Sequence, residues 1–272
     1  MLTTEVVFSR PASLSEAVAA LQEDPGGTAV LAGGMSLVPQ LNLGLVRPRR
    51  IVSLSALDEL RGITTAGDQV RIGAMVVHRD VAASEALAGA APVLAEAARR
   101  IGDVQVRNRG TIGGSIVQAD PWADYLPALV VCRAEVELHG PNGTRRSPIG
   151  QFIHGRNRTG LVEGEMLTGV LLPSLPPHTS WSFVRLARAE GTPAVTTAAV
   201  LVFFSGDVHL AVGGPTCPPL EAAVAREALA DGEPPQDLVA AMEAGTGDDP
   251  AGRYLAAMGT VAARRALAEA LM

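Results

Sequence analysis

The sequence predicts an α+β protein of two domains, and three observations carry this prediction. The chain has 272 residues, more than the roughly 100–200 of a usual single domain. Short apolar strands alternate with helices up to a proline-dense break at Leu172 to Pro177, and beyond it strands are followed by helices. We therefore expect one domain at residues 1–176, in two parts of about 1–56 and 57–176, and a second domain at 177–272.

The first part is predicted to be a small α/β unit. An S-x-x-E capping box at Ser13 and Glu16 begins a helix that should reach Gln22. Apolar runs at 29–31 and 51–54 have the length of short strands. A glycine pair follows the first of these runs, so the chain should turn there between strand and helix.

Hairpins and helices alternate in the rest of the first domain. Polar turns between apolar runs indicate the hairpins, and apolar residues at helical spacing indicate the helices. The predicted elements are a hairpin at 63–72, helices from His78 to Leu87 and from Pro92 to Arg100, a hairpin around Pro141 to Gly143, and a strand from Met166 to Leu172.

The second domain should contain strands followed by helices. The same apolar patterns and a Ser-Gly-Asp turn place three elements of each kind after the proline break. They are strands from Trp181 to Arg188, Ala194 to Phe204 and Val208 to Val212, and helices from Leu220 to Ala230, Pro235 to Ala244 and Ala251 to Leu271.

Composition and charge argue against several classes of protein. The net charge is −6 and there is no basic tract, which argues against binding to nucleic acid. The longest apolar stretch, Ala194 to Phe204, is far shorter than the ~20 residues of a membrane span. Met1 to Glu5 lack the basic-then-apolar order of a signal peptide. We therefore expect a soluble, cytoplasmic protein.

The chain by itself has too few ligands for a metal centre. Its two cysteines, Cys132 and Cys217, are fewer than the about four that an iron–sulfur cluster needs. Its five histidines are scattered without metal-ligand spacing. We expect no metal site, so that an organic cofactor would supply the chemistry of any enzyme built from this chain.

Two glycine pairs are the candidate binding features. Adjacent glycines permit positive φ and let backbone N–H groups converge, which makes a concavity for phosphate oxygens. Two such turns could hold the two halves of a pyrophosphate, although a single glycine pair is far more often an ordinary tight turn. Neither matches the G-x-G-x-x-G or G-x4-G-K-[ST] pattern. The residues are Leu31, Ala32, Gly33, Gly34, Met35, Ser36 and Leu37 in the first turn, and Thr111, Ile112, Gly113, Gly114 and Ser115 in the second.

The second turn and its surroundings resemble a known family. The run from Ile101 to Ser115, followed by Ala119-Asp120-Pro121 and Asp124, closely resembles the flavin-binding medium subunit of molybdenum hydroxylases. This family includes the medium subunit of aerobic carbon monoxide dehydrogenase and the flavin domain of xanthine dehydrogenase. Further matches along the chain are Ala32 to Leu37 with Arg47-Pro48, Ile72 to Ala74, His78 to Asp80, Val212 to Thr216, and Tyr254 to Ala266.

The resemblance implies a fold, a cofactor and its contacts. The fold is the vanillyl-alcohol-oxidase-type (PCMH) FAD-binding domain of two α+β subdomains, plus a C-terminal domain of a small antiparallel sheet and helices. Both glycine turns would line the pyrophosphate of FAD. Ile101 would pack near the isoalloxazine and Asp124 would bond the adenosine side. Leu167 would also contact the cofactor, and Arg185 would lie near the flavin.

The implied function is electron transfer within a larger complex. A molybdopterin subunit oxidises the substrate and an iron–sulfur subunit relays the electrons, in a heterotrimer or its dimer. The FAD of this chain passes them to a terminal acceptor. The shortage of cysteine agrees with this role, because the clusters must then belong to other chains.

One segment departs from the family pattern. Where the family often has an aspartate followed by an aromatic residue that can cover the flavin, this chain has Ala189 to Ala194, with Pro193 in the aromatic position. This departure favours an alternative, a stand-alone FAD-dependent oxidase or dehydrogenase acting directly on a small organic substrate. The intact glycine turns argue against a third class, a relative that has lost its flavin.

Four single residues have an ordinary structural interpretation. Asp120 should cap a turn rather than act as an acid or base. His78 should start a helix or lie at the surface. Cys132 follows an apolar run and should be buried, whereas Cys217 lies in a predicted loop.

Residues beside the second glycine turn have two interpretations each. Trp122 and Tyr125 pack near the adenine or a partner surface, or simply in the interior. Arg107 and Arg109 lie near the FAD phosphates, or bond loop carbonyls. The sequence alone does not separate these alternatives.

Overall fold

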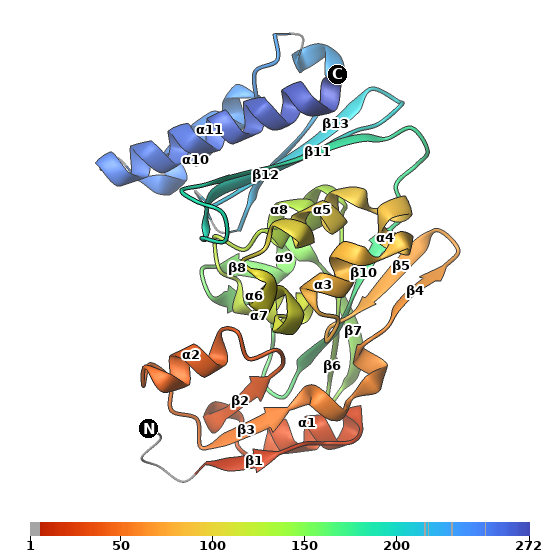
Figure 1. Cartoon of the computed structure of the whole chain (residues 1–272), viewed down its shortest axis with the longest axis vertical. Helices are drawn as coiled ribbons and strands as arrows, with labels where there is room; N and C mark the ends of the chain where they lie inside the picture. Colours follow the sequence, from red (N-terminus) through yellow and green to blue (C-terminus); the bar gives the residue numbers. More distant parts are fainter. Residues whose placement is uncertain (1–5, 215, 217, 230, 248) are drawn as a thin grey trace.

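The molecule consists of three α+β parts that follow one another along its longest axis (Figure 1). The computed structural model describes residues 6–214, 216, 218–229, 231–247 and 249–272. Cys217 and the extreme N-terminus, on which two predictions rest, lie outside these residues. The described strands form sheets of three, five, four and two strands, so the predicted α+β class is confirmed.

The N-terminal part is a small parallel sheet with helices. Strands β1 (Val7–Ser9) and β2 (Thr28–Leu31) both pair in parallel with β3 (Arg50–Ser53). The capping prediction is confirmed, because Ser13 Oγ accepts a hydrogen bond from the backbone N–H of Glu16 at 3.2 Å. The helical elements here are α1 (Leu14–Glu23), α2 (Leu37–Asn42) and 3₁₀ turns at Pro25–Gly27, Leu54–Ala56 and Asp58–Leu60.

The central part is organised by an antiparallel five-stranded sheet. Its order is β4-β5-β10-β6-β7, so β10 lies between two hairpins that are distant in the sequence. Both hairpins were predicted and are confirmed. The strands are β4 (Ile63–Ala66), β5 (Gln69–Gly73), β6 (Glu135–Gly140), β7 (Gly143–Pro148) and β10 (Met166–Pro173), and a separate pair is β8 (Ile153–Gly155) with β9 (Arg158–Thr159).

Helices of the central part include several that the sequence analysis did not predict. The helix expected from His78 to Leu87 is broken at Ser84, whose Oγ accepts from the N–H of Leu87 at 3.3 Å and starts a new helix. The unpredicted helices are too short for an apolar period to emerge. The set is α3 (His78–Ala83), α4 (Glu85–Ala90), α5 (Pro92–Arg100), α6 (Val104–Arg109), α7 (Ile112–Gln118), α8 (Tyr125–Val131) and α9 (Ile149–Phe152).

The C-terminal part packs two helices on an antiparallel sheet. Helix α11 lies across β11 and β12, with α10 beside it (Figure 1). The elements are β11 (Ser180–Ala187), β12 (Ala194–Val202), β13 (Asp207–Gly213), β14 (Leu220–Ala225), a 3₁₀ turn at Arg226–Leu229, α10 (Gln236–Thr246) and α11 (Pro250–Leu271).

The helix predicted from Leu220 to Ala230 is wrong. The first six residues form β14, which pairs with β13 over its whole length. Alternate residues Leu220, Ala222 and Val224 pack against the core of this part. Pairing with the open edge of β13 and this period of two therefore override the helix propensity of the alanines.

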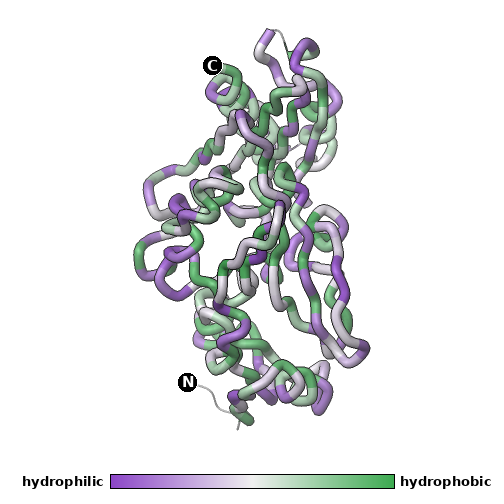
Figure 2. The backbone as a smooth tube through the Cα atoms, turned by 90° about the vertical axis from the view of Figure 1, so that its right-hand side faces the viewer, coloured by the Kyte–Doolittle hydropathy of each residue, from purple (hydrophilic) through white to green (hydrophobic). Residues whose placement is uncertain are grey.

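The core is divided in the same way as the sheets. The largest cluster fills the central part and includes Phe183, Ala199, Leu201 and Ala211 from the C-terminal sheet. A second cluster lies between that sheet and helices α10 and α11, and a third lies mainly in the N-terminal part. Figure 2 shows hydrophobic residues following the interior strands and hydrophilic residues at the outer turns. Within the described ranges, no helix has the length and apolar character to cross a membrane.

Candidate active site

A cavity of about 550 Å³ opens where the three parts meet. Its volume lies within the usual range for sites of small molecules and cofactors. The first glycine loop (residues 31–37) and the second glycine turn (residues 111–115) form adjoining parts of its wall. The residues around His78, Asp124 and Arg185 complete the lining.

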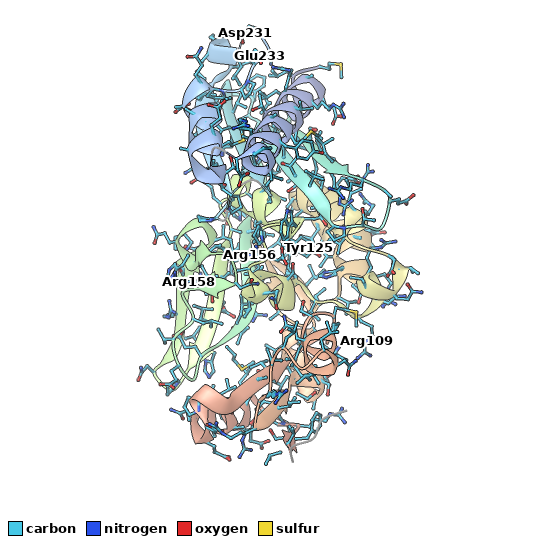
Figure 3. The ribbon with its side chains drawn as sticks, turned by 90° about the vertical axis from the view of Figure 1, so that its left-hand side faces the viewer. Arg109, Tyr125, Arg156, Arg158, Asp231 and Glu233 are labelled. Atoms are coloured by element: carbon cyan, nitrogen blue, oxygen red, sulfur yellow. The ribbon has the colours of Figure 1, made fainter. Side chains whose placement is uncertain are left out.

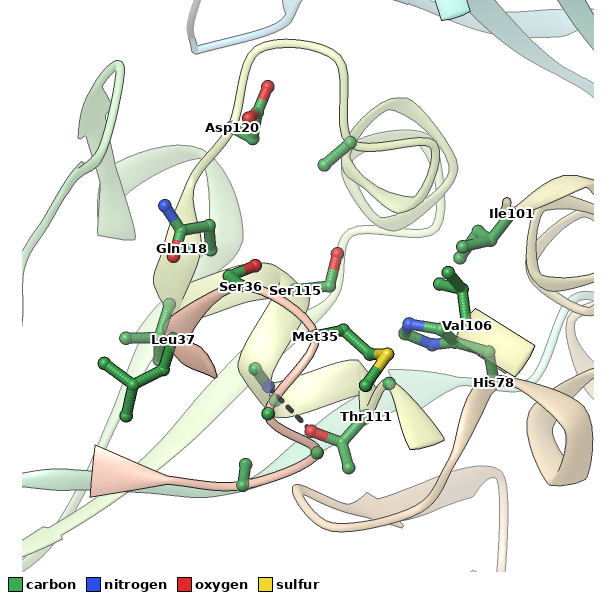
Figure 4. A pocket seen from close by; sticks show the side chains of 18 of the residues that line it. Met35, Ser36, Leu37, His78, Ile101, Val106, Thr111, Ser115, Gln118 and Asp120 are labelled. Carbon is green, nitrogen blue, oxygen red and sulfur yellow. Dashed lines mark hydrogen bonds between the residues drawn. The ribbon is translucent and has the colours of Figure 1, made fainter. Parts of the chain in front are cut away.

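Most of the residues predicted to bind the cofactor line this cavity (Figure 4). Leu31 and Ile112 do not. The side chain of Ile112 is fully buried in the central core, and Leu31 ends β2 in its pairing with Ser53. The predicted residues that line the cavity are Ala32, Gly33, Gly34, Met35, Ser36, Leu37, Ile101, Thr111, Gly113, Gly114, Ser115, Asp124, Leu167 and Arg185.

The first glycine loop presents free backbone donors to the cavity. No atom of the described residues accepts a hydrogen bond from the N–H groups of residues 33–37. Gly34 has φ +79°, a conformation that favours glycine. A Cβ on Gly33 would overlap the carbonyl oxygen of Arg109, so the two glycine segments are in backbone contact. A row of unpaired amides of this kind suits an oxyanion.

The second glycine turn uses its donors within the protein, contrary to the expectation from the sequence. The N–H of Gly113 donates to the carbonyl of Ala74 at 3.0 Å, and that of Ser115 to the carbonyl of Thr111 at 3.0 Å. The N–H of Gly114 donates to Thr111 Oγ1 at 3.1 Å, the bond drawn in Figure 4. Thr111 thereby caps α7. What this turn offers the cavity is the hydroxyl of Ser115.

His78 is buried beside the cavity rather than exposed. It begins α3, as predicted, but only 4% of the residue is accessible. Its Nδ1 lies 3.1 Å from the hydroxyl of Tyr125, which is in the interior of the molecule (Figure 3). Burial, helped by the charge of Arg107, lowers the pKa of His78 to about 4. The imidazole is therefore neutral at pH 7.

Asp124 and Arg185 form a buried ion pair in the cavity wall. Arg185 Nε donates to Asp124 Oδ1 at 2.8 Å, and the two side chains are 9% and 7% exposed. Burial raises the pKa of Asp124 to about 6, against the opposing effect of the Arg185 charge. Arg185 also donates to the carbonyl of Thr192. The pair thus joins the central part to β11 and to the loop that carries Pro193.

The structure separates some alternatives that the sequence left open. Arg107 Nη1 donates to the carbonyls of Ile101 and Gly102 at 2.8 and 2.9 Å, so it bonds loop carbonyls. Arg109 is exposed and does not line the cavity (Figure 3). Asp120 Oδ1 accepts from the N–H of Trp122 at 2.9 Å, as expected for a turn.

The remaining single residues divide between cavity and core. Trp122 lines the cavity, and the guanidinium of Arg156 lies 5.0 Å from the centre of its ring. Cys132 is buried as predicted, and burial raises the pKa of its thiol to about 12. Pro193 lines the cavity with Gly191 and Thr192. In the described part of the chain, no group of three or more His, Cys, Asp or Glu side chains is placed to hold a metal.

Sequence reasoning missed several lining residues. His78 and Val106 lie beside Ile101 at one end of the cavity, whereas Gln118 and Asp120 lie at the other (Figure 4). His78 had a signal, since it stands in a segment that resembles the family. Residues such as Gln118 had none, because α7 brings them to the cavity.

The donor set fits a dinucleotide that carries a pyrophosphate and a ring system. Free amides and the hydroxyls of Ser36 and Ser115 suit the phosphates, and the apolar side chains of Ile101 and Val106 suit a flat ring. Fold and cavity together define an FAD-binding oxidoreductase of the vanillyl-alcohol-oxidase (PCMH) type.

Comparison with known proteins identifies the family. The family described as "FAD binding domain in molybdopterin dehydrogenase" matches residues 4–175. The carbon monoxide dehydrogenase medium chain of Hydrogenophaga pseudoflava is 37% identical over 207 residues, 76% of this chain and 72% of that protein. The glyceraldehyde dehydrogenase medium chain of Sulfolobus acidocaldarius is 34% identical over 218 residues, 79% and 77% of the two chains.

Solved structures agree over the whole chain. Carbon monoxide dehydrogenase from Hydrogenophaga pseudoflava gives a TM-score of 0.85 at 32% identity, covering 100% of this chain and 99% of that one. Quinoline 2-oxidoreductase from Pseudomonas putida gives 0.84 at 26% identity, covering 99% and 98%. The chain belongs to the family of FAD-binding medium subunits of molybdenum hydroxylases, and FAD is its cofactor.

Proposed function

We propose that this chain is the FAD-carrying electron-transfer subunit of a multi-subunit molybdenum hydroxylase. An iron–sulfur subunit delivers electrons that a molybdopterin subunit takes from the substrate, and this chain passes them to a terminal acceptor. The proposal rests on relatives that are medium chains of such enzymes, carbon monoxide dehydrogenase among them. The assembly is a heterotrimer or its dimer.

One observation favours a subunit over a stand-alone oxidase. The titratable side chains of the described cavity wall all have partners: Asp124 with Arg185, Glu165 with Arg145 at 2.7 Å, His78 with Tyr125, and Asp120 with the backbone N–H of Trp122 at 2.9 Å. A direct oxidase needs a base placed to take a proton from its substrate. A site whose described titratable side chains are already hydrogen-bonded suits a flavin that exchanges only electrons with its partners.

The residues around the cavity have separate roles in this proposal. The amides of residues 33–37 and the hydroxyls of Ser36 and Ser115 hold the pyrophosphate. Ile101, with Val106 behind it, lies against the ring system, and Leu167 contacts the cofactor. Asp124 bonds the adenosine side. When bound, FAD supplies the capacity to take up and release electrons, which no side chain of this chain has.

Two further features are proposed with the function. Residues 1–176 form the FAD-binding domain and 177–272 the C-terminal domain, a division supported by the separate core under α10 and α11. Limited proteolysis between residues 172 and 177 tests it. The complex works in the cytoplasm, which fractionation of the native host tests.

Purification from the native host tests the subunit role. Chains that carry iron and molybdenum should co-purify with this one in a constant ratio, and substrate should reduce the flavin only in the complex. A lone yellow chain whose flavin is reduced directly by a small organic compound would support the stand-alone oxidase instead. Colourless protein that cannot be reconstituted with FAD would contradict both.

A further inference from the structure

A second cavity, of about 410 Å³, adjoins the flavin cavity. The two share Gly102, Arg185 and Gly191 as walls. The second cavity lies between the end of α5, the end of β11 and the loop after it, and we call it the arginine cavity. Its lining residues are Arg99, Arg100, Gly102, Arg107, Arg185, Ala187, Ala189, Glu190 and Gly191.

The arginine cavity has more positive than negative charge. Glu96 alone neutralises Arg99 and Arg100, each at 2.7 Å, so two guanidinium groups share one carboxylate. Arg107 has no carboxylate partner among the described residues, because its bonds go to loop carbonyls. Glu190 in the lining is exposed to solvent. This surplus is unusual in a chain of net charge −6 and creates a local attraction for anions.

The position of this charge is informative. The cavities join next to Ile101 and Gly102, at the end where Ile101 and Val106 line the flavin cavity (Figure 4). The free amides for the pyrophosphate belong to the first glycine loop, a different part of the wall. An anion in the arginine cavity is therefore a separate ligand, placed beside the ring system of the cofactor.

We propose that the arginine cavity binds the anionic group of the electron acceptor. The proposal rests on the electron-transfer function above and specifies its acceptor: a small molecule with phosphate or carboxylate groups, which Arg99, Arg100 and Arg107 hold while its redox-active end reaches the shared wall at Gly102 and Gly191. Guanidinium groups bind such oxyanions through paired N–H donors. Because Arg99 and Arg100 are half exposed, the anion enters from solvent.

Direct binding tests the proposal without catalysis. The FAD-saturated chain, in which the first glycine loop is occupied, is titrated with inorganic pyrophosphate and with citrate in a calorimeter. The Arg99→Gln, Arg100→Gln double variant should bind about tenfold more weakly or worse, since it loses two charge-assisted contacts. Glu96→Gln should bind more tightly, because it removes the neutralising charge. Arg79→Gln, at an exposed ion pair outside both cavities, should bind like the wild type.

The two titrants distinguish the source of the anion. Preference for pyrophosphate indicates a phosphate-bearing acceptor, and preference for citrate a carboxylate. No binding by the wild type, or equal binding by the wild type and the double variant, would overturn the proposal. In that case the two arginines would only stabilise the C-terminal end of α5, and the double variant would have a lower melting temperature with no change in anion binding. Because FAD saturation is verified first, this outcome leaves the proposed function intact.

Reoxidation kinetics provide a second readout. The FAD-loaded chain is reduced with dithionite and mixed with ferricyanide, an anion, or with uncharged benzoquinone. The double variant should raise the apparent KM for ferricyanide with little change in kcat, and leave benzoquinone unaffected. An equal change for both acceptors would contradict an anion site, and rising salt should weaken only the ferricyanide reaction.

Discussion

The first glycine loop and the second glycine turn have similar sequences and different uses. Each places two glycines beside a hydroxyl residue just before or within a short helix. In the first, the amides of residues 33–37 have no acceptor in the described chain, and the Ser36 side chain caps nothing. In the second, the amides bond to Ala74 and Thr111. The first loop is free for a ligand, whereas the second holds the protein together.

This difference shows what a glycine pair does and does not indicate. Both pairs mark a close approach of two backbone segments: Gly33 to Arg109, and Gly113 to Ala74, whose carbonyl oxygen would lie 2.7 Å from an added Cβ. In the first loop the amides of residues 33–37 all lack an acceptor among the described residues, whereas in the second turn the amides of residues 112–115 are all bonded. Close approach is a property of the glycines, but free amides depend on what the rest of the fold places opposite them.

The largest expected effect concerns Asp124, on the side of the second turn. Arg185→Gln leaves the buried Asp124 carboxylate without a counter-charge, so the free energy of unfolding at pH 7 should fall by about 3–5 kcal/mol. Urea denaturation of the FAD-free chain measures this. A loss below about 1 kcal/mol would contradict the stabilising role of the Asp124–Arg185 ion pair beside the second glycine turn.

The pH dependence of stability should also come from residues near the second glycine turn, because residues 31–37 of the first loop contain no titratable group. His78, whose pKa is lowered to about 4, destabilises the fold as pH falls below about 6.5, since only the unfolded chain then takes up the proton. Asp124, raised to about 6, stabilises it over the same window, because the folded chain takes up a proton there.

The two groups change the free energy of unfolding in opposite directions, and each pKa unit between folded and unfolded chain corresponds to about 1.4 kcal/mol. The wild type should therefore show little change between about pH 6.5 and 4 from these two groups. Asp124→Asn should lose stability on acidification, and His78→Gln should gain it. Denaturation midpoints across this range measure both slopes. Parallel slopes in the two variants would show that other groups control the pH response.

A smaller effect is expected from the glycine of the second turn. Gly113→Ala places a methyl group against the carbonyl of Ala74 and should cost about 1–3 kcal/mol through overpacking. Gly89→Ala in α4 is the matched control, because nothing lies within 4 Å of its Cβ position and helical Ala is favoured by up to about 1 kcal/mol. Equal melting temperatures for the two variants would contradict the close packing.

The smallest pair of effects separates the turns most sharply. Thr111→Val removes the cap of α7 and should lower stability by about 1 kcal/mol. Ser36→Ala removes no cap and should leave stability unchanged, but weaken FAD binding about fivefold, the value of one lost hydrogen bond. Fluorescence titration with FAD and thermal unfolding give both numbers. If Thr111→Val weakened FAD binding and Ser36→Ala lowered stability, the two turns would have the reverse of the roles described.

The sequence alone predicted much of the fold because many of its signals are local. The Ser13 cap, both hairpins of the central sheet and helix α5 each depend on residues within a few positions of one another. The prediction failed at Leu220 to Ala225, where the edge of β13 supplied hydrogen-bond partners that no local pattern reveals. It also missed the short helices α6 and α7, which begin at the side-chain caps Asp103 and Thr111 but are too short to show an apolar period.

By itself, the sequence determined the α+β class, because caps, turns and apolar periods act on their own neighbourhood. Its resemblance to a family gave the FAD cofactor and most of the predicted cofactor-binding residues that line the cavity. Only the tertiary structure decided which glycine turn keeps its amides free, that His78 is buried and neutral, and that Asp124 meets Arg185, 61 residues away. Burial, hydrogen-bond partners and pKa values arise from groups distant in the sequence, so they exist only once the chain has folded.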